Sequence, residues 1–102
     1  MTVFNWSDAL KECLKENGDE LQNLVVQTPC NRYDEPQETK PRFADIDDAE
    51  FAVPFDPGYG GENGCWFTAW GKKWIYFPAS YDGAEWIAKV PRSVCLYATR
   101  HI

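Results

Sequence analysis

The stretch from Phe51 to Trp86 constrains the fold of this chain more than any other part of it. It holds eleven of the sixteen aromatic residues, among them four of the five tryptophans. The core of a 102-residue chain does not need that many rings, so several of them are expected to face solvent or a binding partner. No catalytic motif accompanies these rings, and the stretch therefore predicts more about the fold than about the function.

Glycine and proline divide the C-terminal half into short strand-like runs. Phe51–Phe55 predicts an edge strand, because it contains a proline. Cys65–Trp70 and Trp74–Pro78 predict the two strands of a hairpin. Ala84–Val90 fits either a strand or one helical turn, and Val94–Thr99 alternates in the manner of a last strand.

The register of the hairpin decides which rings are exposed, because a slip of one residue exchanges the two faces. A two-residue Gly71-Lys72 loop sets Trp70 opposite Lys73, and a three-residue loop sets Trp70 opposite Trp74. The three-residue loop sorts the faces better. Its inward residues are Cys65, Phe67, Ala69, Ile75 and Phe77, and its outward residues are Trp66, Thr68, Trp70, Trp74 and Tyr76.

The first 28 residues predict helical structure. Ser7 or Asn5 can cap a helix that begins near residue 8, and Asn17-Gly18 is typical of its end. A second helix is predicted over Glu20–Gln27, although residues 24–26 also fit a short strand.

Residues 29–50 predict an acidic loop. Residues 1–50 carry twelve acids against five bases, whereas residues 51–102 carry four against five, so the formal charge of −6 arises in the front half. An acidic run is most often a solvated face; the sharper interpretation is a docking surface for a basic partner.

Together these runs predict a single α+β domain over residues 1–102. One or two N-terminal helices (1–28) would pack on an antiparallel sheet of about four strands (51–102), with the acidic loop (29–50) between them. The start of the chain has no secretion-signal pattern, and no run approaches the roughly 20 apolar residues of a membrane span. The four cysteines lack CxxC spacing, so we expect reduced thiols in a cytoplasmic protein and no zinc site.

Catalytic chemistry has little support in this sequence. His101 is the only histidine, so a nucleophilic cysteine or serine has no evident base. Asp45, Asp47 and Asp48 lack the spacing of a calcium-binding loop, and residues 58–64 match no phosphate-binding motif. We therefore predict a non-enzymatic protein without a catalytic residue, a metal or a cofactor.

Binding to another protein is the function that the sequence favours. Tryptophan and tyrosine dominate interface hot spots, and an acidic chain is drawn to basic protein surfaces rather than to nucleic-acid phosphates. No direct nucleic-acid or membrane contact is expected, and a homodimer is possible. The predicted partner-binding residues are Asp45, Asp47, Asp48, Glu50, Tyr59, Trp66, Trp70, Trp74 and Tyr76.

The block from Val53 to Arg92, with VPFDPGYG, FTAW, YFPASYDGAEW and VPR, resembles small proteins of bacterial and prophage genomes. In size, acidity and aromatic content the chain is similar to phage anti-CRISPR and anti-restriction proteins, and to immunity proteins that neutralise bacterial toxins. This similarity implies an inhibitor that acts by protein–protein contact, foremost a phage anti-defence protein. The alternatives are a toxin immunity protein and a small hydrolase or carbohydrate-binding module.

Overall fold

The computed structural model describes residues 4–28, 42–49, 51–58, 64–81 and 84–99. Within these residues it contains one α-helix, one 3-10 helix and five strands. They are α1 (Trp6–Asn17), η1 (Leu21–Asn23), β1 (Val25–Thr28), β2 (Arg42–Ala44), β3 (Thr68–Trp70), β4 (Trp74–Tyr81) and β5 (Ala84–Pro91). The predicted α+β class is confirmed, with five strands in place of about four.

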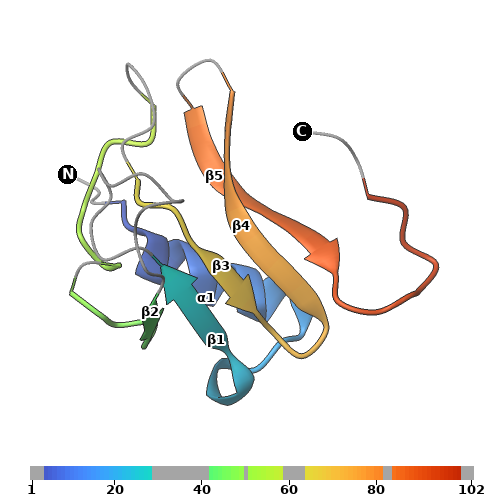
Figure 1. Ribbon diagram of the computed structural model, residues 1–102. Coiled ribbons are helices and arrows are strands. Elements are labelled where there is room, and N and C mark those ends of the chain that lie inside the picture. The colour runs from blue at the N-terminus through green and yellow to red at the C-terminus, as the bar shows by residue number, and fades with distance from the viewer. Residues whose placement is uncertain (1–3, 29–41, 50, 59–63, 82–83, 100–102) are drawn as a thin grey trace.

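The strands form one antiparallel sheet in the order β2-β1-β3-β4-β5. Figure 1 shows α1 crossing behind this sheet, so that the helix covers one face only. β1 lies in the segment predicted to be helical, and β2 lies in the predicted acidic loop. The sheet is therefore built from both halves of the chain.

Local signals define α1. The Asn5 side chain caps it by accepting a hydrogen bond from Asp8 N at 2.8 Å, and Gly18 ends it with a left-handed φ of 71°. Both predicted ends are confirmed, with Asn5 rather than Ser7 as the cap. Among the described residues, no helix is both long and apolar enough to cross a membrane.

The core lies between α1 and the covered face of the sheet. Trp6, Leu10 and Leu14 point from the helix to this core, where they meet buried residues of the strands and loops. The other members of the cluster are Val26, Ile46, Phe51, Cys65, Phe67, Ala69 and Tyr76. The predicted second helix is wrong, since Val25–Thr28 is a strand whose residues alternate between solvent and core.

Two predicted strands are also absent from the sheet. Phe51 is buried in the core, and the only strand-like contact of its segment is an isolated bridge between Phe4 and Phe55. Val94–Thr99 is irregular and exposed. The reason lies in the register of β5: Pro91 already pairs with Trp74, the first residue of β4, so the following residues run past the end of their neighbour. The ambiguous segment 84–90 belongs to a strand.

Candidate protein-binding surface

The turn of the β3–β4 hairpin has a register that differs from both predicted ones. Trp70 lies opposite Ile75, and Gly71 N donates to Trp74 O at 2.8 Å, which leaves a two-residue Lys72-Lys73 loop. The determinant is Asp19, whose Oδ1 accepts from Lys73 N at 2.8 Å. Gly71 is needed for close approach, because a Cβ there would lie 2.5 Å from Asp19 Oδ2.

This register moves Tyr76 into the core, so its predicted place on the outer face is wrong. Its ring is completely buried, and its hydroxyl donates to Asp19 Oδ2 at 2.6 Å. Burial, and then the hydrogen bond to the Asp19 carboxylate, raise the pKa of Tyr76 well above its usual value. Tyr76 holds the sheet to the end of α1 and is not available to a partner.

Trp74 also lies on the helix side of the sheet, against the prediction. Its ring meets Tyr97 edge to face at a centroid distance of 4.8 Å. Lys89 Nζ sits 4.1 Å from the Trp74 ring centroid and donates to Asn17 Oδ1 at the end of α1. Trp74 is thus half-buried in a cluster that joins β4, β5 and the C-terminal segment.

Trp70 lies on the face of the sheet that α1 does not cover, opposite Val25 of β1 and Ile75 of β4. Trp66 precedes β3, and we assign it to the same face because its neighbours Cys65 and Phe67 are buried in the core. The register carries this face across all five strands. Residues paired across neighbouring strands form rows on this face. One row consists of Val25, Trp70, Ile75 and Val90, and a second row includes Phe43, Gln27 and Thr68. Alternation along the strands adds Phe77, Ala79, Trp86 and Ala88. We call these eleven residues, together with Trp66, the open face.

The open face is aromatic and uncharged. Its rim is well exposed: Phe43 shows 70% of its surface, Val25 45% and Trp86 39%. None of its twelve described residues is Asp, Glu, Lys or Arg. Antiparallel sheets normally present polar residues on a solvated face. An apolar face of this extent is typical of a surface that binds another protein.

The predicted acidic residues do not all lie at one site, since Asp45 and Asp47 line a common groove and Asp48 does not. Asp47 forms an ion pair with Lys11, at 2.6 Å between Oδ1 and Nζ. The hydrogen bond from Lys11 lowers the pKa of Asp47, and the same bond raises the pKa of Lys11. Asp48 accepts from Phe51 N at 3.4 Å within a turn, whereas Asp45 is exposed. Within the described residues, no group of three His, Cys, Asp or Glu side chains could hold a metal ion.

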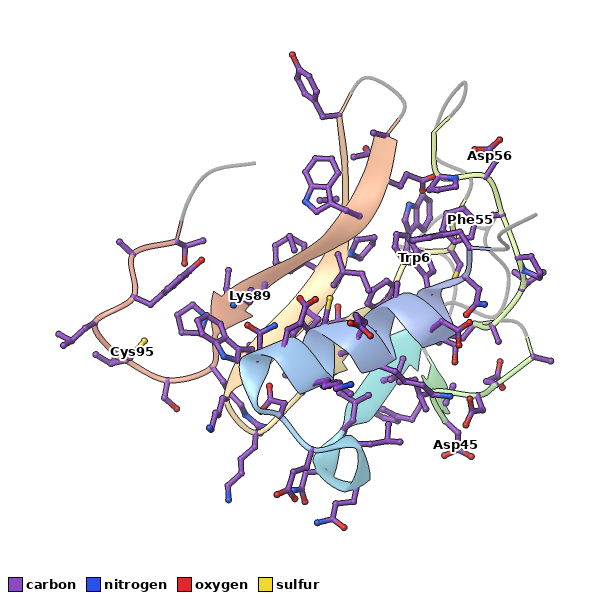
Figure 2. All side chains as sticks on the ribbon, turned by 180° about the vertical axis from the view of Figure 1, so that it is seen from behind. Trp6, Asp45, Phe55, Asp56, Lys89 and Cys95 are labelled. Atoms are coloured by element: carbon purple, nitrogen blue, oxygen red, sulfur yellow. The ribbon has the colours of Figure 1, made fainter. Side chains whose placement is uncertain are left out.

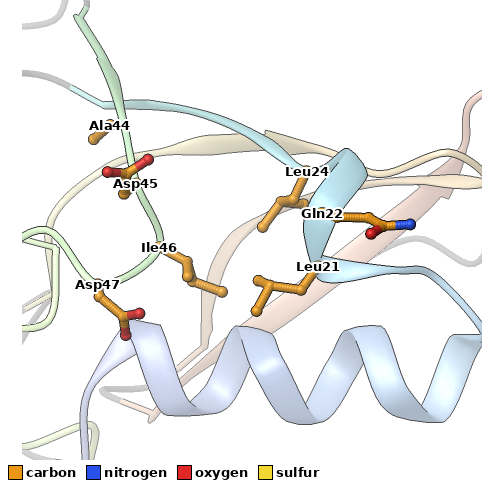
Figure 3. A pocket seen from close by; sticks show the side chains of 7 residues that line it. All are labelled: Leu21, Gln22, Leu24, Ala44, Asp45, Ile46 and Asp47. Carbon is orange, nitrogen blue, oxygen red and sulfur yellow. The ribbon is translucent and has the colours of Figure 1, made fainter.

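Asp45 instead borders a groove between η1 and β2. The groove has a volume of about 380 Å³. Figure 3 shows the side chains of Leu21, Leu24 and Ile46 converging on it, with the carboxylates of Asp45 and Asp47 along one side. It therefore combines an aliphatic floor with an acidic border.

A second, smaller cavity lies beside Trp66 and Glu85. Its volume is about 60 Å³, well below the roughly 300 Å³ at which small-molecule sites begin. Glu85 accepts from Gly64 N at 3.0 Å there. A hydrolase or sugar site needs a concave pocket with two carboxylates and aromatic walls. Neither cavity has that combination, since the groove lacks aromatic walls.

Two predicted binding residues, Glu50 and Tyr59, lie outside the described residues, as does His101. Val25 and Phe43 belong to the open face but are not among the residues predicted from the sequence. The alternation of side chains along residues 25–28 could have identified Val25. Phe43 could not have been identified, because it belongs to the face only through the pairing of β2 with β1. Comparison with protein-family models, curated proteins and solved structures found no match. The function of the surface is therefore inferred from its own chemistry.

Proposed function

We propose that this protein is a non-enzymatic inhibitor that binds another protein through the open face. The observation that carries the proposal is the uncharged, aromatic surface that spans all five strands opposite α1. Rigid rings bury a large area for little conformational entropy, which is why aromatic residues dominate interface hot spots. Trp66, Trp70, Phe43 and Trp86 are the anchors of this contact.

The partner has a basic surface next to the patch that receives the open face. The acids of residues 1–50 steer the encounter, because complementary charge raises the rate of association more than its final strength. The inhibitor acts in the cytoplasm, which the free thiols of Cys13 and Cys95 support. Its partner is a nuclease, a toxin or another component that handles nucleic acid.

Within this class we favour a phage anti-defence protein of the anti-CRISPR kind. The similarity in size, acidity and aromatic content supports it, as does the apolar open face. A toxin immunity protein would use the same surface chemistry, and is the second candidate.

The test is phage plating on bacterial strains that carry defined CRISPR–Cas or restriction systems. The wild-type chain is expected to restore plating on at least one such strain. The double variant Phe43→Ser/Trp86→Ser removes two exposed anchors and is expected to lose this effect. Each lost anchor should weaken binding by roughly tenfold or more, from a hot-spot contribution above about 1.4 kcal/mol.

Val53→Ser is the matched control, because Val53 is an exposed aliphatic residue outside the open face. It should behave as the wild type, with all proteins showing the same circular dichroism spectrum. Equal activity of the double variant would contradict a role for the open face. Protection against a co-expressed toxin, without any effect on plating, would select the immunity protein.

A further inference from the structure

The segment after β5 forms an arch that is held at both ends. At its start, Arg92 N donates to Lys73 O at 3.0 Å and the Arg92 guanidinium donates to Gly71 O at 2.9 Å. At its end, the Tyr97 ring packs edge to face on Trp74. The four residues between these anchors, Ser93 to Leu96, project from the body, and we call them the arch.

The arch displays two aliphatic side chains that touch nothing else in the described structure. Val94 and Leu96 are both fully exposed. Figure 2 shows Cys95, which lies between them, at the outer edge of the molecule. Leaving an aliphatic side chain in water forgoes the favourable free energy of its burial. Val94 and Leu96 therefore form an exposed apolar protrusion on an anchored segment, and we call this protrusion the knob.

The groove between η1 and β2 is the surface that matches this knob. Its floor is aliphatic, and Leu21 on its edge is half-exposed. Figure 2 places Asp45, at the groove, and Cys95, in the arch, on opposite sides of the molecule. The arch of one chain therefore does not reach the groove of the same chain.

The charges beside the two features are of opposite sign. The arch starts beside the exposed Lys72, Lys73 and Arg92. The groove is bordered by Asp45 and Asp47, of which Asp47 is already paired with Lys11. Like charges would repel two copies of an acidic chain elsewhere on the surface, whereas this pairing brings a basic turn to a carboxylate.

We propose that the protein self-associates, with the arch of one copy docked in the groove of a second copy. Leu96 and Val94 enter the groove against Leu21, and the Lys72-Lys73 turn faces Asp45. The contact joins two different surfaces. Two copies can therefore exchange arches in a dimer with two-fold symmetry, or successive copies can assemble into an open chain. It leaves the open face uncovered and is independent of the inhibitor function proposed above.

The experiment is sedimentation velocity of the purified protein from low to high micromolar concentration. The wild type is expected to form dimers or larger species, and added salt should weaken them. Leu96→Asp destroys the knob, and Leu21→Asp places a charge in the groove. Both positions are exposed, so neither change disturbs the fold, and each variant alone should be monomeric.

An equimolar mixture of the two variants separates this contact from any other. The Leu96→Asp chain retains an intact groove and the Leu21→Asp chain an intact arch, so the mixture should form a dimer and nothing larger. Thr99→Asp and Val53→Asp, exposed positions outside both features, should associate as the wild type does.

Three results would overturn the proposal. They are a monomeric wild type at every concentration, association that survives both single variants, and a mixture that stays monomeric while the wild type associates. The second result would assign association to another surface, such as the open face.

Discussion

Asp19 is the residue on which the hairpin turn depends. Its buried carboxylate accepts from Lys73 N and from the Tyr76 hydroxyl. We expect Asp19→Ala to lower the free energy of unfolding by about 1–3 kcal/mol, because it leaves two donors without their acceptor. Urea denaturation followed by tryptophan fluorescence measures this loss. Glu20→Ala, at the exposed neighbouring position, should change the value little, and an equal loss there would contradict the assignment.

The raised pKa of Tyr76 predicts a pH dependence of stability. Below the unfolded-state pKa of about 10, both states keep the phenol proton and the bond to Asp19 contributes in full. Above it the unfolded chain ionises first, so the free energy of unfolding falls as pH rises, by up to about 1.4 kcal/mol per pH unit. Denaturation at several pH values above neutral should show a flatter profile for Tyr76→Phe. Parallel profiles would refute this role.

Two glycines allow a matched test of close packing. A Cβ at Gly64 would lie 2.5 Å from Nε1 of the buried Trp6, whereas one at Gly58 would meet only Asp56 Oδ1 at 3.7 Å. Gly64→Ala should therefore cost about 1–3 kcal/mol through overpacking. Gly58→Ala should be nearly neutral. Thermal unfolding of the two variants side by side decides the point, and equal melting temperatures would rule out the contact.

At the scale of the element, β1 offers a direct test of which of its side chains face the core and which face solvent. Val26 is buried against α1, and its neighbour Val25 is exposed on the open face. Val26→Ala should cost about 1.5–3 kcal/mol, and Val25→Ala less than about 0.5. Chemical denaturation of both variants measures the difference. A reversed order would mean that the strand is shifted by one residue.

The elements that could be predicted from the sequence are those whose signals are local. The cap at Asn5, the glycine at residue 18 and the apolar spacing between them define α1 within a few residues. The hairpin register could not be predicted, because it depends on Asp19, fifty-four residues before the Lys73 amide that it binds. In the sequence Gly71 resembles a turn residue. In the structure a glycine is required at this position because a Cβ would collide with the Asp19 carboxylate.

The same distinction applies to the candidate site. The aromatic density predicts an exposed patch, and Trp70 lies on the predicted face of the sheet. The pattern could not separate Tyr76 from Trp70, since that depends on the turn. Val94–Thr99 has the alternation of a strand, yet β4 begins too late to pair with it. Strand propensity is a property of a segment, whereas pairing requires a neighbour.

For the whole molecule, the sheet separates two kinds of surface. One face packs against α1 and the core, and α1 does not cover the other (Figure 1). The twelve described residues of this open face carry no charge. The described acids of residues 4–49 are not among the twelve residues of the open face. Under the function that we propose, long-range charge would guide the partner toward the molecule, and the final contact would contain no ion pairs, which are costly to desolvate.

The alternation along β4 also has a consequence for how the gene tolerates mutation. Tyr76 supports the fold, while its neighbours Ile75 and Phe77 lie on the open face. Substitutions at Tyr76 should reduce the amount of protein in the cell. Those at Ile75 and Phe77 should preserve abundance and weaken the inhibition that we propose for the open face. A library of single variants would be scored once for abundance and once for activity. Along β4, substitutions that reduce abundance should alternate with substitutions that reduce activity alone.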